Sequence, residues 1–209
     1  MLTFSQAQLV GELEQLPARM RTIFAAGCAE RILPAYERFS RRTGLGDDVA
    51  LQGVLARLWA DLAGDRMSKI ESESGISMCR RLSADAEDHV ADQVAAEDAA
   101  AAVAYALACG LNGRAEDAGW AGCRAYEAVF AFVIRNECID VNTPYGKRVA
   151  RGEHPLLQAE LVRQRRDIDE LLLHGASETE MAGVVRRRSQ DERNLALPFS
   201  ETQRGGLEA

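Results

Sequence analysis

Three charged residues are the candidates for chemistry in this sequence, because none of them has a partner on its own helix. Side chains three and four positions apart share one face of a helix. At these positions Glu30, Arg31 and Asp98 have only small or apolar neighbours. A buried charge without a partner is very costly, so each of the three must reach solvent or pair with another helix. We therefore predict that Arg31 pairs with Asp98, with Glu30 or with both.

A site built around these charges would have one of two roles. Charges held in apolar surroundings occur in binding and catalytic pockets, but structural ion pairs produce the same pattern. If the site is a pocket, its tentative binding residues are Glu30, Arg31, Tyr36 and Asp98. The structural interpretation is the simpler one, because an ion pair satisfies the charges without any ligand.

Metal-dependent and thiol-dependent chemistry find little support in the sequence. A helical bundle binds a metal pair through Glu and Glu-x-x-His ligands on facing helices, but none of His89, His154 and His174 follows a glutamate by three positions. The cysteines lack a CxxC spacing, which is typical of reduced packing residues; they are Cys28, Cys79, Cys109, Cys123 and Cys138. A P-loop and a dinucleotide fingerprint are also missing. We therefore expect no metal and no cofactor.

Both Glu30 and Arg31 belong to the stretch around which the rest of the chain is expected to pack. Apolar residues recur at helical spacing from Met20 to Phe39, which predicts a long amphipathic helix. Pro34 lies inside it, where proline removes one backbone hydrogen bond and clashes with the carbonyl four residues back. We expect a kink there, and the carbonyl that loses its donor belongs to Glu30.

The periodicity predicts an all-α fold, a single-domain multi-helix bundle of about seven helices with a kinked central helix. Alanine is abundant, β-branched and aromatic residues are sparse, and no stretch alternates at two-residue spacing. The expected helices cover about 5–16, 17–42, 48–63, 92–109, 114–138, 155–174 and 178–195, with a short one at 67–73. Residues 74–91 are expected to be mostly loop. The domain should span 1–195, followed by a flexible tail at 196–209.

The net charge of −7 is concentrated in one region of the chain. Between Leu82 and Asp98 there are acidic residues and no lysine or arginine. The candidate partner surface consists of Asp85, Glu87, Asp88 and Asp92. Such a surface attracts a basic protein, and it repels nucleic acid, whose phosphates require a basic footprint. We therefore predict a basic protein partner and disfavour nucleic acid.

Targeting and membrane segments are not indicated. The N-terminus has no basic region before an apolar run, and it begins an amphipathic helix that contains Glu12 and Glu14. No run approaches the roughly 20 apolar residues of a membrane span. We expect a cytoplasmic protein that does not enter a membrane.

A family resemblance rests on several short groups of residues. They are Phe24, Glu30, Arg31, Pro34, Tyr36 and Phe39, then Thr43-Gly44-Leu45-Gly46-Asp47, Asp98-Ala99, and Pro155 with Glu160 and Gln164. With them the chain resembles the YjaG-like bacterial family, also called domain of unknown function 416, over about 16–172. The resemblance implies an all-helical, soluble bacterial protein and supplies no catalytic residues. Beyond Leu172 a new cap at Ser177 departs from the family pattern, so the last helix is expected to be specific to this protein.

Two functions from different classes are consistent with these observations. The first is a non-enzymatic interaction module whose acidic region binds a basic partner, for example a toxin-neutralising immunity protein. The second is a small-molecule-binding or hydrolytic enzyme with a pocket lined by Glu30, Arg31 and Asp98. An open pocket at these residues would favour the enzyme, and a closed ion network would favour the module. The sequence leaves the oligomeric state open.

Overall fold

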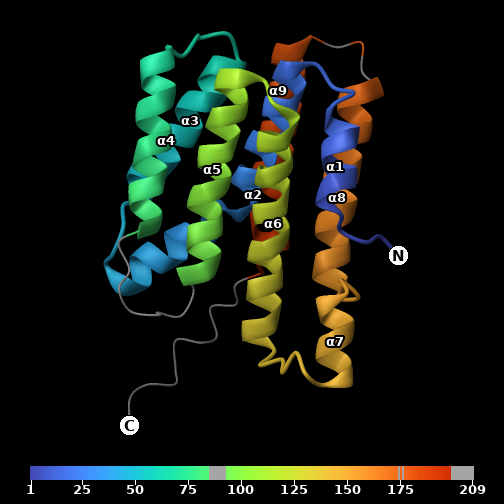
Figure 1. Ribbon diagram of the computed structural model, residues 1–209. Coiled ribbons are helices and arrows are strands. Elements are labelled where there is room, and N and C mark those ends of the chain that lie inside the picture. Colours follow the sequence, from blue (N-terminus) through green and yellow to red (C-terminus); the bar gives the residue numbers. More distant parts are fainter. Residues whose placement is uncertain (85–92, 174, 176, 199–209) are drawn as a thin grey trace.

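The computed structural model describes residues 1–84, 93–173, 175 and 177–198, and these residues form helices and no strands (Figure 1). Among them, the helices of eight or more residues are α1 (Gln6–Leu13), α2 (Ala18–Thr43), α3 (Asp48–Leu62), α4 (Lys69–Ala84), α5 (Gln93–Asn112), α6 (Ala115–Asn136), α8 (Pro155–Leu173) and α9 (Glu178–Asp191). The short helices are α7 (Pro144–Ala150) and α10 (Arg193–Ala196). The predicted all-α bundle of about seven helices is confirmed.

The central helix of the bundle is α2. It contacts α3, α5, α6, α8, α9 and α10, and Figure 1 shows α5 and α6 in front of it, α3 and α4 to one side, and α1 and α8 to the other. Residues 22–36 are buried at every position. A helix that is enclosed all round lies in the core rather than at the surface. The amphipathic pattern predicted for this helix therefore applies only to its ends.

The helix α2 begins and ends where the local sequence predicts. Pro17 is its N-cap, and Gly44 ends it with a φ of 70°, a left-handed conformation that glycine adopts without a steric cost. Pro34 lies inside the helix, which continues on both sides of it. The Glu30–Arg31 turn is thereby held in the middle of the molecule, with helical backbone before and after it.

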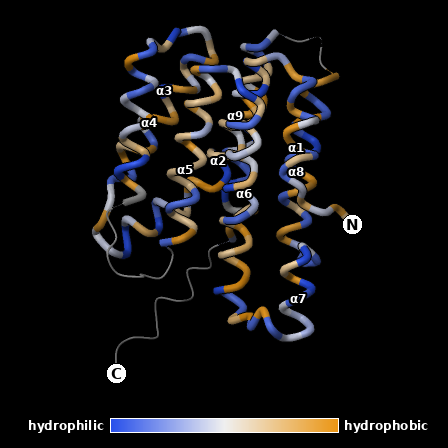
Figure 2. Tube along the Cα trace, viewed as in Figure 1, coloured by the Kyte–Doolittle hydropathy of each residue, from blue (hydrophilic) through white to orange (hydrophobic). Residues whose placement is uncertain are grey.

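The alanine-rich helix α5 packs against α2, α4 and α6. Small side chains let helix backbones approach closely, and those of Ala99, Ala102 and Ala106 have no exposed surface. In Figure 2 this helix is coloured largely toward the hydrophobic end of the scale. By length and composition α5 is apolar enough to cross a membrane, and it is the one such helix in the described part of the chain. Half of its apolar window is buried inside the protein, as in a core helix.

The prediction that residues 74–91 are mostly loop is wrong for residues 74–84, which belong to α4. Serine and glycine are poor helix formers, but tertiary packing overrides propensity. Gly75 lies so close to α5 and α3 that an added Cβ would be 3.0 Å from Leu107 Cδ1 and 3.3 Å from Val54 Cγ1. Cys79, one turn later, is fully buried. Residues 85–92 lie outside the described part of the chain.

The C-terminal part forms a helix that opens with the predicted capping box. Ser177 Oγ accepts a hydrogen bond from the Glu180 backbone N–H, and the Glu180 carboxylate accepts one from the Ser177 N–H. Packing continues past residue 195, where the domain was predicted to end, because Ala196 and Leu197 are buried. The rest of the predicted tail, 199–209, lies outside the described residues.

A buried ion network as the candidate functional site

Arg31 is enclosed by two carboxylates from α8. Its Nη1 donates to Asp167 Oδ2 at 2.7 Å, and its Nη2 donates to Glu160 Oε1 at 3.1 Å. All three side chains have 0% exposure. Burial alone would lower the pKa of Arg31, but Glu160 and Asp167 outweigh it and raise this pKa well above the ordinary value. Arg31 is therefore a permanent cation neutralised inside the protein.

The face of α8 that meets Arg31 is polar although it is buried. Glu160, Gln164 and Asp167 follow one another at steps of four and three, which places them on one side of the helix. Gln164 Nε2 donates to Glu160 Oε1 at 3.1 Å and to the Gly122 carbonyl of α6 at 3.0 Å. The arrangement ties α2, α6 and α8 together through one connected set of hydrogen bonds.

Asp167 extends the network toward α9. Its Oδ1 accepts from Arg188 Nη2 at 2.7 Å and from Arg166 Nη2 at 3.0 Å. Burial would raise the pKa of Asp167, but the charges of Arg31, Arg166 and Arg188 together hold it below its ordinary value. Arg188 also pairs with Glu170. The carboxylate therefore stays ionised and joins three helices.

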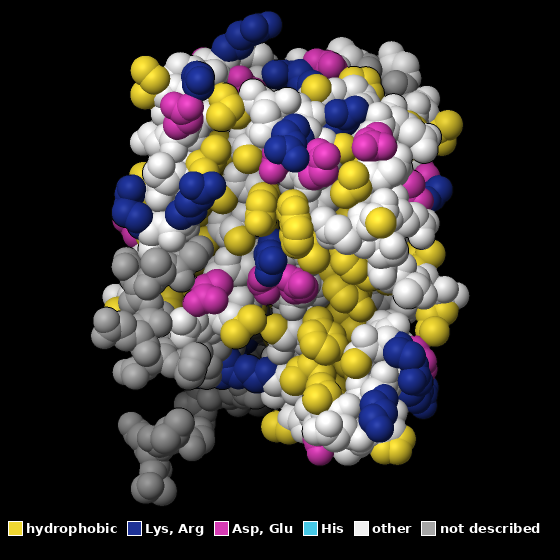
Figure 3. All heavy atoms as spheres, viewed as in Figure 1, with side chains coloured by type: hydrophobic (Ala, Val, Ile, Leu, Met, Phe, Trp, Pro, Cys, Tyr) yellow, Lys and Arg dark blue, Asp and Glu magenta, His cyan; other side chains and the backbone are white. Residues whose placement is uncertain are grey.

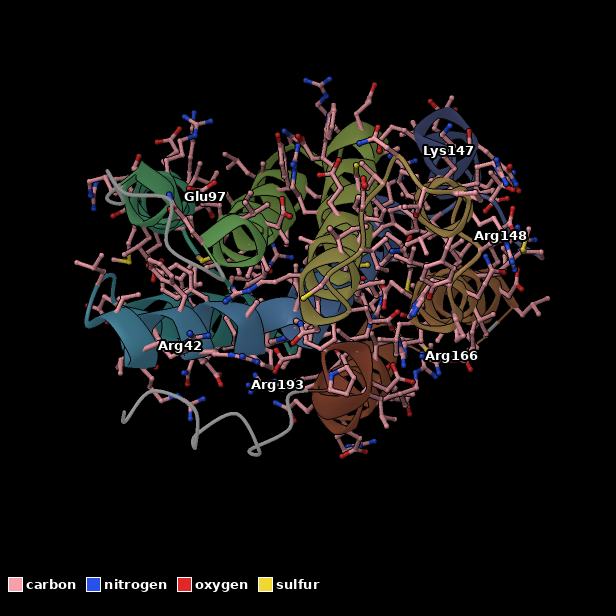
Figure 4. All side chains as sticks on the ribbon, turned by 90° about the horizontal axis from the view of Figure 1, so that it is seen from below. Arg42, Glu97, Lys147, Arg148, Arg166 and Arg193 are labelled. Carbon is pink, nitrogen blue, oxygen red and sulfur yellow. The ribbon has the colours of Figure 1, made fainter. Side chains whose placement is uncertain are left out.

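Arg166 closes the network at its outer edge. Its Nη1 donates to Glu192 at 2.6 Å, and Figure 4 shows Arg166 beside α8 and α9. Arg163 pairs with Glu160 at 3.5 Å. The network then contains Arg31, Arg163, Arg166 and Arg188 as cations and Glu160, Asp167, Glu170 and Glu192 as anions. The formal charges balance, so the network has no excess charge that would require a ligand.

Glu30 points away from Arg31, so the predicted Arg31–Glu30 pair is wrong. Its Oε2 accepts from Trp59 Nε1 of α3 at 2.7 Å, and its Oε1 pairs with Arg193 of α10. Arg193 also approaches Glu37 at 3.5 Å. Figure 4 shows Arg193 between the ribbons of α2 and α9. Successive residues of a helix point in different directions, so Glu30 and Arg31 reach different helices.

Asp98 lies in a different part of the molecule, so the predicted Arg31–Asp98 pair is also wrong. Its Oδ1 accepts from Arg124 Nη1 of α6 at 3.1 Å, and Arg124 also binds Glu127. Burial raises the pKa of Asp98 to about 6, and Arg124 only partly offsets this rise. Figure 3 shows the face formed by α5 and α6, where hydrophobic side chains form a band with charged side chains among them.

Tyr36, the fourth tentative binding residue, fixes the end of α2. Its hydroxyl donates to the Leu82 carbonyl and accepts from the Asp47 N–H, each at 3.4 Å. An added Cβ at Gly46 would overlap this hydroxyl, and Gly46 has a φ of 74°. Tyr36 therefore packs against the loop that follows α2. The four residues Glu30, Arg31, Tyr36 and Asp98 do not come together in one site.

Four of the five thiols and the described histidine are in structural settings, whereas Cys138 is exposed, so the prediction of a packing role is wrong for Cys138. Burial raises the pKa of Cys79 and Cys123 to about 12 and that of Cys109 to about 11, so these thiols stay protonated at neutral pH. His154 Nδ1 accepts from the Leu156 N–H at 3.2 Å, and its Nε2 lies 2.8 Å from Glu137. The ring thus caps the start of α8. Within the described ranges, no three metal-type side chains are grouped together.

Two hollows of the surface lie away from the three candidate charges. One, of about 260 Å³, is lined by Arg80 of α4, Tyr105 of α5 and Asp117 of α6, among others. The other, of about 360 Å³, lies over the outer face of α8. Neither hollow is lined by Glu30, Arg31 or Asp98.

The fold and the site define this protein as an all-helical bundle with an ion network around its central helix. The chain belongs to the DUF416 family, whose model, described as a protein of unknown function, matches residues 8–194. In structure it is similar to a DUF416 family protein from Shewanella baltica OS155, with a TM-score of 0.72 and 18% identity over 87% of this chain and 93% of that chain. At this identity the likeness concerns the fold. The search of curated proteins found no match.

The family match confirms the resemblance and extends its range. It continues to residue 194 and therefore includes α9, which ends at Asp191. The prediction that the last helix is specific to this protein is wrong. Since α9 supplies Arg188 to the network, the matched region contains the whole of the ion network described above.

Asp167 is the direct partner of Arg31 that the sequence interpretation did not single out at all. Glu160 and Gln164 contributed only to the family resemblance, with no partner proposed for either. A signal was present: polar residues at 160, 164 and 167 share a face with the apolar positions 157, 161, 168 and 171. Polar side chains within an apolar helix face are costly unless another helix satisfies them.

Proposed function

We propose that this protein is a non-enzymatic protein-interaction module. The observation that carries the proposal is the closed state of the ion network: Arg31 pairs with both Glu160 and Asp167, and all three side chains have 0% exposure. Such a cluster orients helices and has no free charge to offer a substrate. The alternative, an enzyme with a Glu30, Arg31 and Asp98 pocket, requires the three side chains to face one cavity, and they have separate partners on different helices.

The partner surface that we propose is the acidic segment between α4 and α5. Asp85, Glu87, Asp88 and Asp92 lie there, with no lysine or arginine from Leu82 to Asp98. These residues are outside the described part of the chain, so the support comes from their charge and from the ordered helices on both sides. A dense run of one sign accelerates encounter with a partner of the opposite sign. The partner is therefore a basic protein, and an immunity-type complex is one form of it.

The test is capture of partners by the tagged full chain, followed by titration of each identified partner at low and high salt. Exposed charges are screened beyond about 8 Å at physiological ionic strength, so we expect binding to weaken steeply as salt rises. A variant with Asp85→Asn, Glu87→Gln, Asp88→Asn and Asp92→Asn should lose most of the binding and most of the salt dependence.

A matched variant separates a local surface from net charge. It neutralises Glu14, Asp65, Glu73 and Asp191, which are exposed acids on other parts of the protein. This variant has the same net charge as the first and should bind the partner almost as the unmodified chain does. Equal losses in both variants, or partners that remain bound unchanged at high salt, would refute the acidic segment as the partner surface.

A further inference from the structure

The outer face of α8 has exposed apolar residues at both ends of a charged centre. Val162 is 56% exposed and Leu173 is 82% exposed. Between them, Arg166 and Asp169 have side chains that are 32% and 46% exposed. The open hollow over this helix is lined by all four of these residues. Val162 and Leu173 are 11 positions apart, so this face has two separate apolar ends with charges between them rather than one continuous apolar patch.

The spacing of these four residues along α8 is the same from either end of the helix. From Val162 to Arg166 is four positions, from Arg166 to Asp169 is three, and from Asp169 to Leu173 is four. These steps keep the residues on one face of a helix. If a second α8 lies antiparallel across it, Val162 faces Leu173 of the other copy, and Arg166 faces Asp169 of the other copy. Both contacts occur twice, as a two-fold axis requires.

We propose that α8 is a homodimerisation surface, on which a second copy of this chain packs its own α8 in the antiparallel direction. The apolar ends of one α8 cover the apolar ends of the other. Two Arg166–Asp169 ion pairs, each formed between the two copies, lie near the two-fold axis. The charges on this face are self-complementary in the antiparallel arrangement, whereas a parallel arrangement would place Arg166 against Arg166. A second copy is therefore the occupant that the pattern itself specifies.

The interactions within one chain are compatible with this packing. Arg166 binds Asp167 and Glu192 through its guanidinium, and Asp169 pairs with Arg165. Arg165 keeps a second partner, Glu12, at 2.6 Å, so Asp169 can turn toward the other copy without leaving a cation unpaired. The face is only about 16 Å long at 1.5 Å per residue, so the interface is small and the dimer should be weak.

Sedimentation equilibrium of the full chain from about 1 µM to about 1 mM covers the range of a weak dimer. We expect a monomer–dimer equilibrium that weakens with salt. Val162→Glu and Leu173→Lys should each weaken self-association by about tenfold or more, because each substitution places a charge against an apolar side chain at both ends. Both positions are at the surface, and circular dichroism checks that each variant is folded.

Mixing the two variants tests the direction of the helices. In the mixed dimer, the glutamate introduced at position 162 of one chain faces the lysine introduced at position 173 of the other, and the opposite end is the original Val162–Leu173 contact. Association of the mixture should therefore recover to about the unmodified level. Control variants Val49→Glu and Ile70→Lys change residues that are 74% and 78% exposed on α3 and α4, and they should associate as the unmodified chain does.

Three results would overturn the proposal. The first is a monomer at every concentration, and the second is a dimer that Val162→Glu and Leu173→Lys leave intact. The third is a mixture that associates no better than either variant alone, which would exclude the antiparallel register. This surface and the acidic segment lie on different parts of the chain, so the failure of either proposal leaves the other standing.

Discussion

Two buried carboxylates, Asp167 and Asp98, show how differently the same kind of residue behaves in two regions of this protein. Asp167 lies between α2, α8 and α9, accepts hydrogen bonds from three arginines, and has a lowered pKa. Asp98 lies between α5 and α6 and has one arginine, which it shares with Glu127. Its pKa is raised to about 6 by burial.

Burial alone therefore does not decide whether a carboxyl group is ionised. Both carboxylates are removed from water, with residue exposures of 0% for Asp167 and 5% for Asp98. What differs is the number of cations that face each one and how far those cations are themselves screened. Arg31 is fully enclosed, whereas the Arg124 side chain is 29% exposed. Solvent weakens the pull of Arg124 on its partner.

The largest expected effect comes from removing the central cation. Arg31→Met should destabilise the protein by about 3–5 kcal/mol, because it leaves Glu160 without its α2 partner and weakens the compensation of Asp167 inside the core. Urea unfolding followed by circular dichroism measures the change. Arg41→Met is the matched control, since Arg41 is on the same helix with a 71% exposed side chain, and it should change stability by less than about 0.5 kcal/mol.

A smaller effect of opposite sign is expected at Asp98. Its folded pKa of about 6 lies above its ordinary 3.8, so the folded protein binds this proton more tightly than the unfolded chain. The corresponding stability is present below about pH 4 and is lost as the pH rises through about 6. Asp98→Asn removes the ionisation, so at pH 7.5 it should stabilise the protein by about 1–2 kcal/mol.

Unfolding midpoints between pH 4 and pH 7.5 check this prediction. The difference between Asp98→Asn and the unmodified protein should grow across this range, where Asp98 ionises in the folded protein. A constant difference, or a loss of stability at pH 7.5, would mean that Asp98 is as well paired as Asp167. Asp167, whose folded pKa is lowered, contributes stability that is lost only at more acidic pH.

A destabilisation no larger than the Asp98 effect is expected where the helices around the network approach closely. A Cβ on Gly27 would be 2.9 Å from Val185 Cγ1 and 3.1 Å from Ser189 Oγ. Gly27→Ala should therefore cost about 1–2 kcal/mol despite the better helix propensity of alanine. Gly53→Ala on α3 has nothing within 4 Å and should stabilise by about 0.5–1 kcal/mol. The midpoints of thermal unfolding of the two variants measure these changes. Equal midpoints for Gly27→Ala and Gly53→Ala would mean that α2 and α9 are loosely packed, contrary to this prediction.

The sequence predicted the fold and the central position of α2, because helical periodicity, alanine content and caps are local signals. It also predicted that Arg31 must find a partner on another helix. The identity of that partner was wrong, because it depends on which helix packs against α2, and pairing between helices is not encoded in local spacing. Asp98 and Asp167 both lie on helices that contact α2. Only the three-dimensional packing decides which of the two carboxylates pairs with Arg31.

The error in α4 has a similar cause. Ser and Gly between residues 72 and 77 indicate a loop when neighbours in sequence alone are considered. In the folded protein Ser72 is buried, and Gly75 is in close contact with Leu107 of α5 and Val54 of α3. A poor helix former is tolerated where its small size permits packing.

The most direct test of the closed network around Arg31 is a pair of double-mutant cycles, in which stability is measured by urea unfolding. The cycle of Arg31→Met with Glu160→Gln should show a coupling of about 1–3 kcal/mol, because the double variant removes both members of one buried pair. The cycle of Arg31→Met with Asp98→Asn should be additive within about 0.5 kcal/mol. Coupling between Arg31 and Asp98, with additivity between Arg31 and Glu160, would contradict the closed network and restore the Arg31–Asp98 pair that the sequence predicted.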